Sequence, residues 1–159
     1  MQKLAKRTNN AIWNLYASKL LKMSTIKGIA RHWKVSVLDA SGLSGGLLTA
    51  WDPSFGDFQA YHTKAGLLVE GFFRGYPDLI RVLNIYGPYR DRQLFWDLVE
   101  RSKILQLENL IVGGDLNLTL GPSEVWGGKA LVDPMSVYFK QLFMKKNLVD
   151  ISFTSLVPT

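Results

Sequence analysis

The sequence predicts an α/β fold with a mostly antiparallel or mixed sheet, and two observations carry this prediction. Strand-forming runs separated by short turns of Pro, Gly and Asp occupy residues 35–86. A helical segment, a short apolar strand and a second helical segment follow them. Connections of hairpin length favour antiparallel neighbours over a doubly wound parallel sheet. At 159 residues, 47% of them hydrophobic, the chain is one domain or part of one, with enough apolar material for a core.

The N-terminal region is basic. Residues 1–38 contain eight Lys and Arg residues and no acid, whereas the rest of the chain is slightly acidic. We expect residues 1–10 to be disordered, and the helical spacing of apolar residues in 11–23 predicts a helix there. Residues 1–18 are interpreted as a basic, partly disordered or helical arm, and residues 19–159 as the domain.

The strands and helices follow from periodicity and punctuation. The predicted strands are Val35–Leu38, Gly46–Trp51, Phe58–His62, Leu67–Phe73, Leu79–Tyr86 and Asn109–Gly114. Asp91 is the expected N-cap of a helix reaching about Leu107, whose inner face is expected to carry Leu94, Phe95, Leu98 and Leu105. A second helix is expected to start at Asp133-Pro134 and to bury a stripe of Met135, Tyr138, Phe139, Leu142 and Phe143.

The most informative motif is Ile111-Val112-Gly113-Gly114-Asp115-Leu116-Asn117, a short strand that ends in glycines and two polar residues. Glycines permit close approach of a ligand or of neighbouring backbone. If the extended geometry continues, the side chains of Asp115 and Asn117 point the same way and can hold a water beside a phosphate. Asp and Asn are also common turn residues after strands, and this motif alone indicates only a turn.

Two further motifs give the strand end a context. Arg81–Tyr89 is a strand closed by Gly87-Pro88, with Tyr86 at its end, and Asp39–Asp52 is a glycine-serine turn followed by an apolar strand and Trp-Asp-Pro. In this order and spacing the three motifs resemble the endonuclease/exonuclease/phosphatase superfamily. More narrowly, they are similar to the endonuclease domain of plant LINE-type non-LTR retrotransposons, over about Lys19 to the C-terminus.

The resemblance implies a four-layer α/β sandwich and Mg²⁺-dependent hydrolysis of a phosphodiester. It assigns Asp115 as the base or water-positioning residue and Asn117 as a phosphate contact. It assigns the Tyr86 hydroxyl to support of the scissile phosphate. Tyr89 stands where family members often have asparagine, so no role is carried over to it.

Other parts of the family's site have no match. The metal-binding glutamate of the "Q-E-T-K" motif is missing near Ser18-Lys19, and the "S-D-H" histidine has no counterpart before Thr159. Asp52 and Glu124 are the carboxylates that could substitute, although no motif places them. Glu70, Glu100 and Glu108 are interpreted as solvated charges, and His32 and His62 as structural residues. We therefore expect a truncated, incomplete four-layer sandwich with impaired catalysis and an unknown metal-ligand set.

Charge and composition bound the partners. A basic arm can contact nucleic-acid phosphates in a salt-dependent way, which makes non-catalytic nucleic-acid binding the alternative function. The first interpretation of this arm is a solvated tail, nucleic-acid contact comes second, and part of an organellar targeting segment comes third. The lack of cysteine excludes disulfides, zinc–thiolate sites and cysteine nucleophiles. With no apolar run of membrane-spanning length and no secretory signal, we expect no membrane partner and an intracellular protein, in nucleus or cytoplasm.

Overall fold

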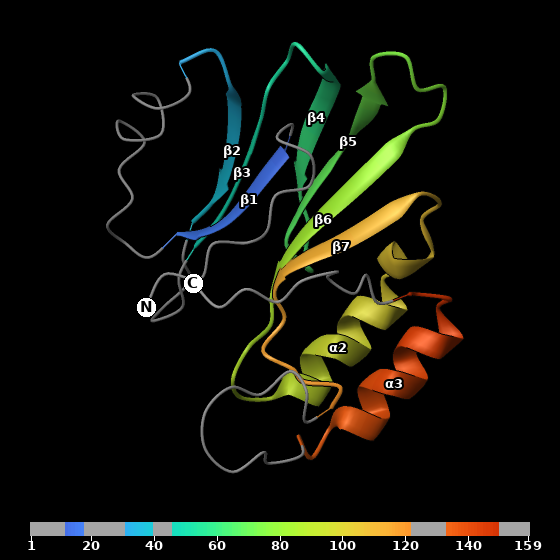
Figure 1. Ribbon diagram of the computed structural model, residues 1–159. Coiled ribbons are helices and arrows are strands. Elements are labelled where there is room, and N and C mark those ends of the chain that lie inside the picture. The colour runs from blue at the N-terminus through green and yellow to red at the C-terminus, as the bar shows by residue number, and fades with distance from the viewer. Residues whose placement is uncertain (1–11, 18–30, 40–45, 122–132, 150–159) are drawn as a thin grey trace. The chain divides into compact units, whose positions relative to one another are not determined.

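The computed structural model describes the backbone of residues 12–17 and, in full, residues 31–39, 46–121 and 133–149 (Figure 1). In chain order the elements are β1 (Ile12–Ala17), β2 (Lys34–Leu38), β3 (Gly46–Trp51), β4 (Gly56–His62), β5 (Leu67–Phe73), β6 (Ile80–Tyr86), α2 (Arg92–Arg101), the 3₁₀ turn η1 (Ile104–Gln106), β7 (Leu110–Asp115) and α3 (Ser136–Lys145). The chain divides into two compact units, residues 1–117 and 118–159. None of the helices among these residues is long and apolar enough to cross a membrane.

The first sheet is antiparallel, with strand order β1-β3-β2. The helix predicted for residues 11–23 is wrong over Ile12–Ala17, which pairs with β3 from Ile12↔Trp51 to Ala17↔Gly46. A short apolar run fits helical and strand periodicities alike, and here pairing with β3 satisfies its backbone groups. Residues 1–10 and 18–23, the rest of that prediction, lie outside the described residues.

The second sheet has strand order β4-β5-β6-β7 and is mixed, as the sequence predicted. Its first three strands are antiparallel neighbours joined by short turns, whereas β6 and β7 are parallel. A parallel pair needs a long crossover. Residues 87–109, which contain α2 and η1, supply it.

A buried apolar layer lies between the two sheets. Trp51 of β3 packs with Phe58, Val69 and Val82 of the second sheet, and all four side chains are buried. Because strand residues alternate between faces, β6 directs Val82 and Asn84 toward the first sheet and Leu83 and Ile85 away from it. Within residues 12–117, Figure 1 shows α2 on the opposite side of the second sheet from the first. The described residues thus form an α/β structure with two sheets and two helices.

The helix α2 has Asp91 at its N-cap position, as predicted, but it ends earlier than predicted and its buried face differs in part. Asp91 has a left-handed backbone (φ 52°) and makes no side-chain cap, and the helix stops at Arg101 before the separate turn η1. Its buried residues are Trp96 and Val99. Of the predicted inner face, Leu105 in η1 is buried and Phe95 is half-buried, whereas Leu94 and Leu98 are 62% and 53% exposed. The indole of Trp96 removes more apolar surface from water than either leucine, so the helix is rotated to bury it.

The second unit contains α3, which confirms the predicted stripe. Phe139 and Leu142 are buried and Met135, Tyr138 and Phe143 are half-buried. The helix itself begins at Ser136, slightly later than predicted. Asp133 still organises the start, because its carboxylate accepts the Met135 N–H (2.9 Å) and its carbonyl accepts the Ser136 N–H (2.9 Å).

Candidate functional site

The structure brings Tyr86 and Asp115 together at the carboxyl ends of β6 and β7. They are direct partners in the parallel ladder, and the Gly87 N–H donates to the Asp115 carbonyl (2.8 Å). By strand alternation both side chains lie on the face that carries Val82 and Asn84, toward the first sheet. Both residues are half-buried. The site is therefore at the rim of the layer between the sheets, where a substrate can reach a carboxylate and a phenol at once.

Asn117 is held at the same place, although not by continued strand geometry. Its backbone is left-handed (φ 48°), and its N–H donates to Asp115 Oδ1 (3.2 Å), which forms an Asx turn. The expectation that Asp115 and Asn117 point the same way along an extended chain is therefore wrong. The Asn117 side-chain amide instead donates to the Gly87 carbonyl. It ties the turn after β7 to the turn after β6 and so fixes Asp115 next to Tyr86.

The motif glycines have a backbone explanation. A Cβ on Gly114, which has φ 116°, would lie 2.1 Å from the Ile85 carbonyl oxygen. A Cβ on Gly87 would lie 2.0 Å from the Leu116 carbonyl oxygen. Both positions thus allow the two strand ends to approach each other, which no residue with a Cβ permits.

Sequence analysis missed Asn84, which lies two residues before Tyr86 and is 1% exposed. Its Nδ2 donates to the Leu48 carbonyl (3.1 Å) and to Thr49 Oγ1 (3.2 Å), both on β3 of the other sheet. Asn84 therefore fixes the position of β6 along β3, and so also the position of Tyr86, two residues further on in β6. The available signal was a single polar residue inside the apolar run Val82–Ile85.

The order of contacts between β3 and β6 shows where the Asp39–Asp52 motif, which contains β3, lies relative to Tyr86. Trp51 packs on Val82, while Leu48 and Thr49 contact Asn84, so the two strands run in opposite directions past each other. The start of β3 at Gly46 consequently lies toward the Tyr86 end, and Asp52 lies beyond the other end. Asp52 therefore cannot supply a second carboxylate beside Asp115.

Asp52 has a structural role where it lies. Its carboxylate accepts the Ser54 N–H (2.8 Å) and contacts His32 Nε2 (3.2 Å), at the turn that follows β3. These contacts, with the Ser54 N–H the largest, hold the pKa of Asp52 below its ordinary value. The exposed His32 thus links the segment before β2 to Asp52, the residue after β3. His62 is exposed at the end of β4.

The remaining predicted carboxylates also lie away from Asp115 or outside the structure. Glu70 is not a free solvated charge, because it forms an ion pair with Arg81 (3.1 Å) on the face of the second sheet that points away from the first. Glu108 precedes β7, at the opposite end of that strand from Asp115. Glu124 and residues 1–11 and 18 of the basic arm lie outside the described residues.

Among Asp115, Asn117 and Tyr86, Asp115 is the single carboxylate, so a magnesium ion bound by these residues would take its other ligands from substrate and water. Mg²⁺ in nuclease-type sites is bound by one or two carboxylates together with substrate phosphates and waters, in a near-octahedral arrangement. Within residues 31–39, 46–121 and 133–149, no group of three His, Cys, Asp or Glu side chains could hold a metal ion. Asp115 stands alone there and already accepts a backbone N–H. What the arrangement offers is an oriented carboxylate beside a phenol, which can position water and contact a phosphate.

Comparison of the sequence with protein-family models and with curated proteins gave no match.

Proposed function

We propose that this chain is an endonuclease-like domain of the endonuclease/exonuclease/phosphatase type, of LINE retrotransposon origin, with impaired catalysis. In this proposal it binds nucleic acid, and its remaining site residues are Asp115, Asn117 and Tyr86. In this proposal the chain on its own lacks part of the metal-binding residues that phosphodiester hydrolysis uses.

One observation carries the proposal: Tyr86 and Asp115 are ladder partners at the same sheet rim although they belong to separate motifs. A phosphodiester at this rim would meet the Tyr86 hydroxyl as a hydrogen-bond donor and the Asp115 carboxylate as an acceptor for a water proton. Asn117 supports both by holding Gly87 against the turn after Asp115. A hydrogen-bond donor and a carboxylate on adjacent strand ends are groups that can position a phosphate ester and a water.

The impairment rests on charge at the site. A phosphoryl transition state gathers negative charge, which Mg²⁺ or a cation must stabilise. Asp115 is the carboxylate at this rim among the described residues, and the acids Asp52 and Glu70 lie away from it with partners of their own. We therefore assign the residues to substrate positioning and derive no step through a metal ion.

The test is incubation of the purified chain with supercoiled plasmid and Mg²⁺, beside Asp115→Asn, Tyr86→Phe and an EDTA control. Glu108→Gln is the matched control, because it removes one exposed carboxylate at the other end of β7. We expect binding by gel shift and nicking no faster than that of Asp115→Asn. Fast nicking that requires both Mg²⁺ and Asp115 would overturn the impairment, and a folded chain that binds no DNA would overturn the proposal.

The second candidate function is nucleic-acid binding through the basic arm, favoured by eight bases and no acid in residues 1–38. Deletion of residues 1–10 tests it and leaves β1 intact. It removes three bases, so the salt dependence of duplex binding should fall by about 0.9 per lost phosphate contact. An unchanged slope would exclude Lys3, Lys6 and Arg7 from the interface.

A further inference from the structure

The end of the second sheet opposite to Tyr86 and Asp115 carries three aromatic side chains that are about half exposed. Phe72 is 51% exposed, Tyr76 49% and Phe55 47%. Backbone hydrogen bonds hold their segments together, because the Arg74 N–H donates to the Phe55 carbonyl (2.8 Å) and the Tyr76 N–H to the Phe73 carbonyl (3.1 Å). Three large rings are thus exposed on chain segments that backbone hydrogen bonds join, and exposed aromatic side chains of this kind are candidates for ligand contact. We call Phe55, Phe72, Arg74 and Tyr76 the aromatic turn surface.

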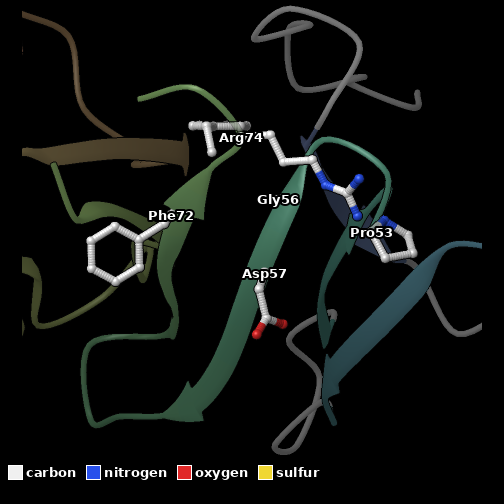
Figure 2. Close-up of a pocket in the computed structure, with 6 residues that line it drawn as sticks. Pro53, Gly56, Asp57, Phe72 and Arg74 are labelled. Carbon is white, nitrogen blue, oxygen red and sulfur yellow. The ribbon is translucent and has the colours of Figure 1, made fainter. Parts of the chain in front are cut away.

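An open cavity of about 470 Å³ lies within this surface, lined by Pro53, Gly56, Asp57, Phe72, Phe73 and Arg74 (Figure 2). Figure 2 shows the Arg74 guanidinium extended toward Pro53, while the Phe72 ring projects from the other side of its strand. Gly56 contributes no side chain between them. Phe72 and Arg74 both contribute to the lining of the cavity, and their side chains point to different sides of the strand end (Figure 2).

Charge pairing leaves this surface with a positive group. Asp57 contacts the Lys34 ammonium (3.7 Å), and Asp52, next to Pro53, contacts His32 and the Ser54 N–H. Arg74 forms no ion pair with the acids of the described residues under a 4.0 Å limit. The acids that border the cavity are thus partly compensated, whereas the Arg74 charge is available to an anionic ligand.

We infer that the aromatic turn surface binds single-stranded nucleic acid. Unpaired bases present π faces that stack on exposed aromatic rings, and their phosphates match an exposed arginine. A duplex hides those faces, so the preference should be for single strands. The surface begins where β6 begins and the candidate site lies where β6 ends, roughly 20 Å away at about 3.3 Å per residue. This inference goes beyond the proposed function and involves none of its residues.

The test is fluorescence anisotropy of the full chain with a labelled oligo-dT of about 16 nucleotides, which spans the site sizes of known single-strand binders. Phe72→Ala should weaken binding roughly tenfold, because one base loses its stacking partner. Arg74→Gln should weaken it several-fold and lower the salt slope by about 0.7, the value for one single-strand phosphate contact. Matched controls are Leu94→Ala and Arg101→Gln, an exposed apolar and an exposed basic residue on α2. Both should leave the affinity unchanged.

Both test residues are exposed, so the variants should keep the wild-type thermal melt, which is measured alongside. Equal affinities of wild type, Phe72→Ala and Arg74→Gln would overturn the inference. The inference would also be overturned if sedimentation showed a dimeric wild type and a monomeric Phe72→Ala variant with unchanged oligo-dT binding. The aromatic turn surface would then bind a second copy of the chain. Asp115→Asn in the same assay should bind normally. A failure here therefore differs from a failure of the proposed function, which is read from duplex plasmid and Asp115.

Discussion

The two ends of the four-stranded sheet are built in different ways. At the Tyr86 end, backbone contacts fix every predicted site residue: Asn117 donates to Gly87, Asp115 accepts the Asn117 N–H, and Gly114 lies against Ile85. At the Phe72 end, two backbone hydrogen bonds hold the turn segments, and the aromatic rings that project from them are about half exposed. The first end depends on local backbone geometry, which a motif records in its glycines and turn residues. The second depends on which surfaces remain uncovered.

The largest effect is expected from a substitution that prevents the close approach of the β6 and β7 backbones at the Tyr86 end of the sheet. Gly114→Ala places a Cβ about 2.1 Å from the Ile85 carbonyl oxygen at a positive φ, and neither backbone can move without disrupting the parallel pair. We expect about 3 kcal/mol or more of lost stability in urea unfolding. Gly75→Ala is the control, because it shares a positive φ (79°) but meets open space, and should cost about 1 kcal/mol. Equal losses would show that crowding at Gly114 is unimportant.

A somewhat smaller effect is expected from the contact that joins the two sheets behind this end. Asn84→Ala removes the hydrogen bonds to Leu48 and Thr49 and leaves a small buried gap, with an expected loss of about 2–3 kcal/mol in denaturant unfolding. The control is Gln59→Ala, at an exposed position on β4, which should cost less than about 0.5 kcal/mol. A loss below about 0.5 kcal/mol for Asn84→Ala would mean that the sheets are aligned by apolar packing alone.

Asn117 allows backbone conformation to be separated from side-chain bonding. Asn117→Gly keeps access to φ 48° and loses the bond to Gly87, so it should cost about 1 kcal/mol. Asn117→Ala loses the bond and adds backbone strain, for a total of about 2 kcal/mol. If thermal or urea unfolding ranks alanine equal to glycine, the turn does not require the left-handed conformation.

The smallest expected effect is the pH dependence contributed by Asp52. Its folded-state pKa lies below its unfolded value, so its contribution to stability is present above the unfolded pKa and is lost as the pH falls through the folded one. The urea midpoint of wild type should exceed that of Asp52→Asn near neutral pH, and the difference should shrink below about pH 4. A difference that stays constant between neutral and acidic pH would contradict the assignment.

The sequence was sufficient for much of the fold because its strands are well punctuated. Gly46–Trp51 and Leu67–Phe73 match the observed strands at both ends. The helix predicted for residues 11–23 was wrong where β1 forms, because six apolar-rich residues suit either structure and their partner strand lies far along the chain. The inner face of α2 was misplaced because helical spacing alone does not say whether the leucines or Trp96 face the sheet.

In the candidate site, too, residues with local contacts could be predicted from the sequence, whereas residues with distant partners could not. Asp115 and Asn117 stand out in the sequence because turn chemistry is local, and the interpretation of this motif as a turn agrees with the observed Asx geometry. Asn84 and the Asp52–His32 contact were missed because their partners lie on distant strands and leave no spacing signal. The exposure of Phe72 was likewise beyond prediction, since alternation divides a strand into faces without telling which face is covered.

The parallel pairing of β6 with β7 has a consequence for the order in which the chain assembles. Strands β4, β5 and β6 meet through short turns, so their contacts are local and can form early. Tyr86 and Asp115 become neighbours only after residues 87–109 close a much longer loop. A protease cut anywhere in that loop would leave the two residues on separate fragments. An intact crossover is therefore what makes these two residues one site.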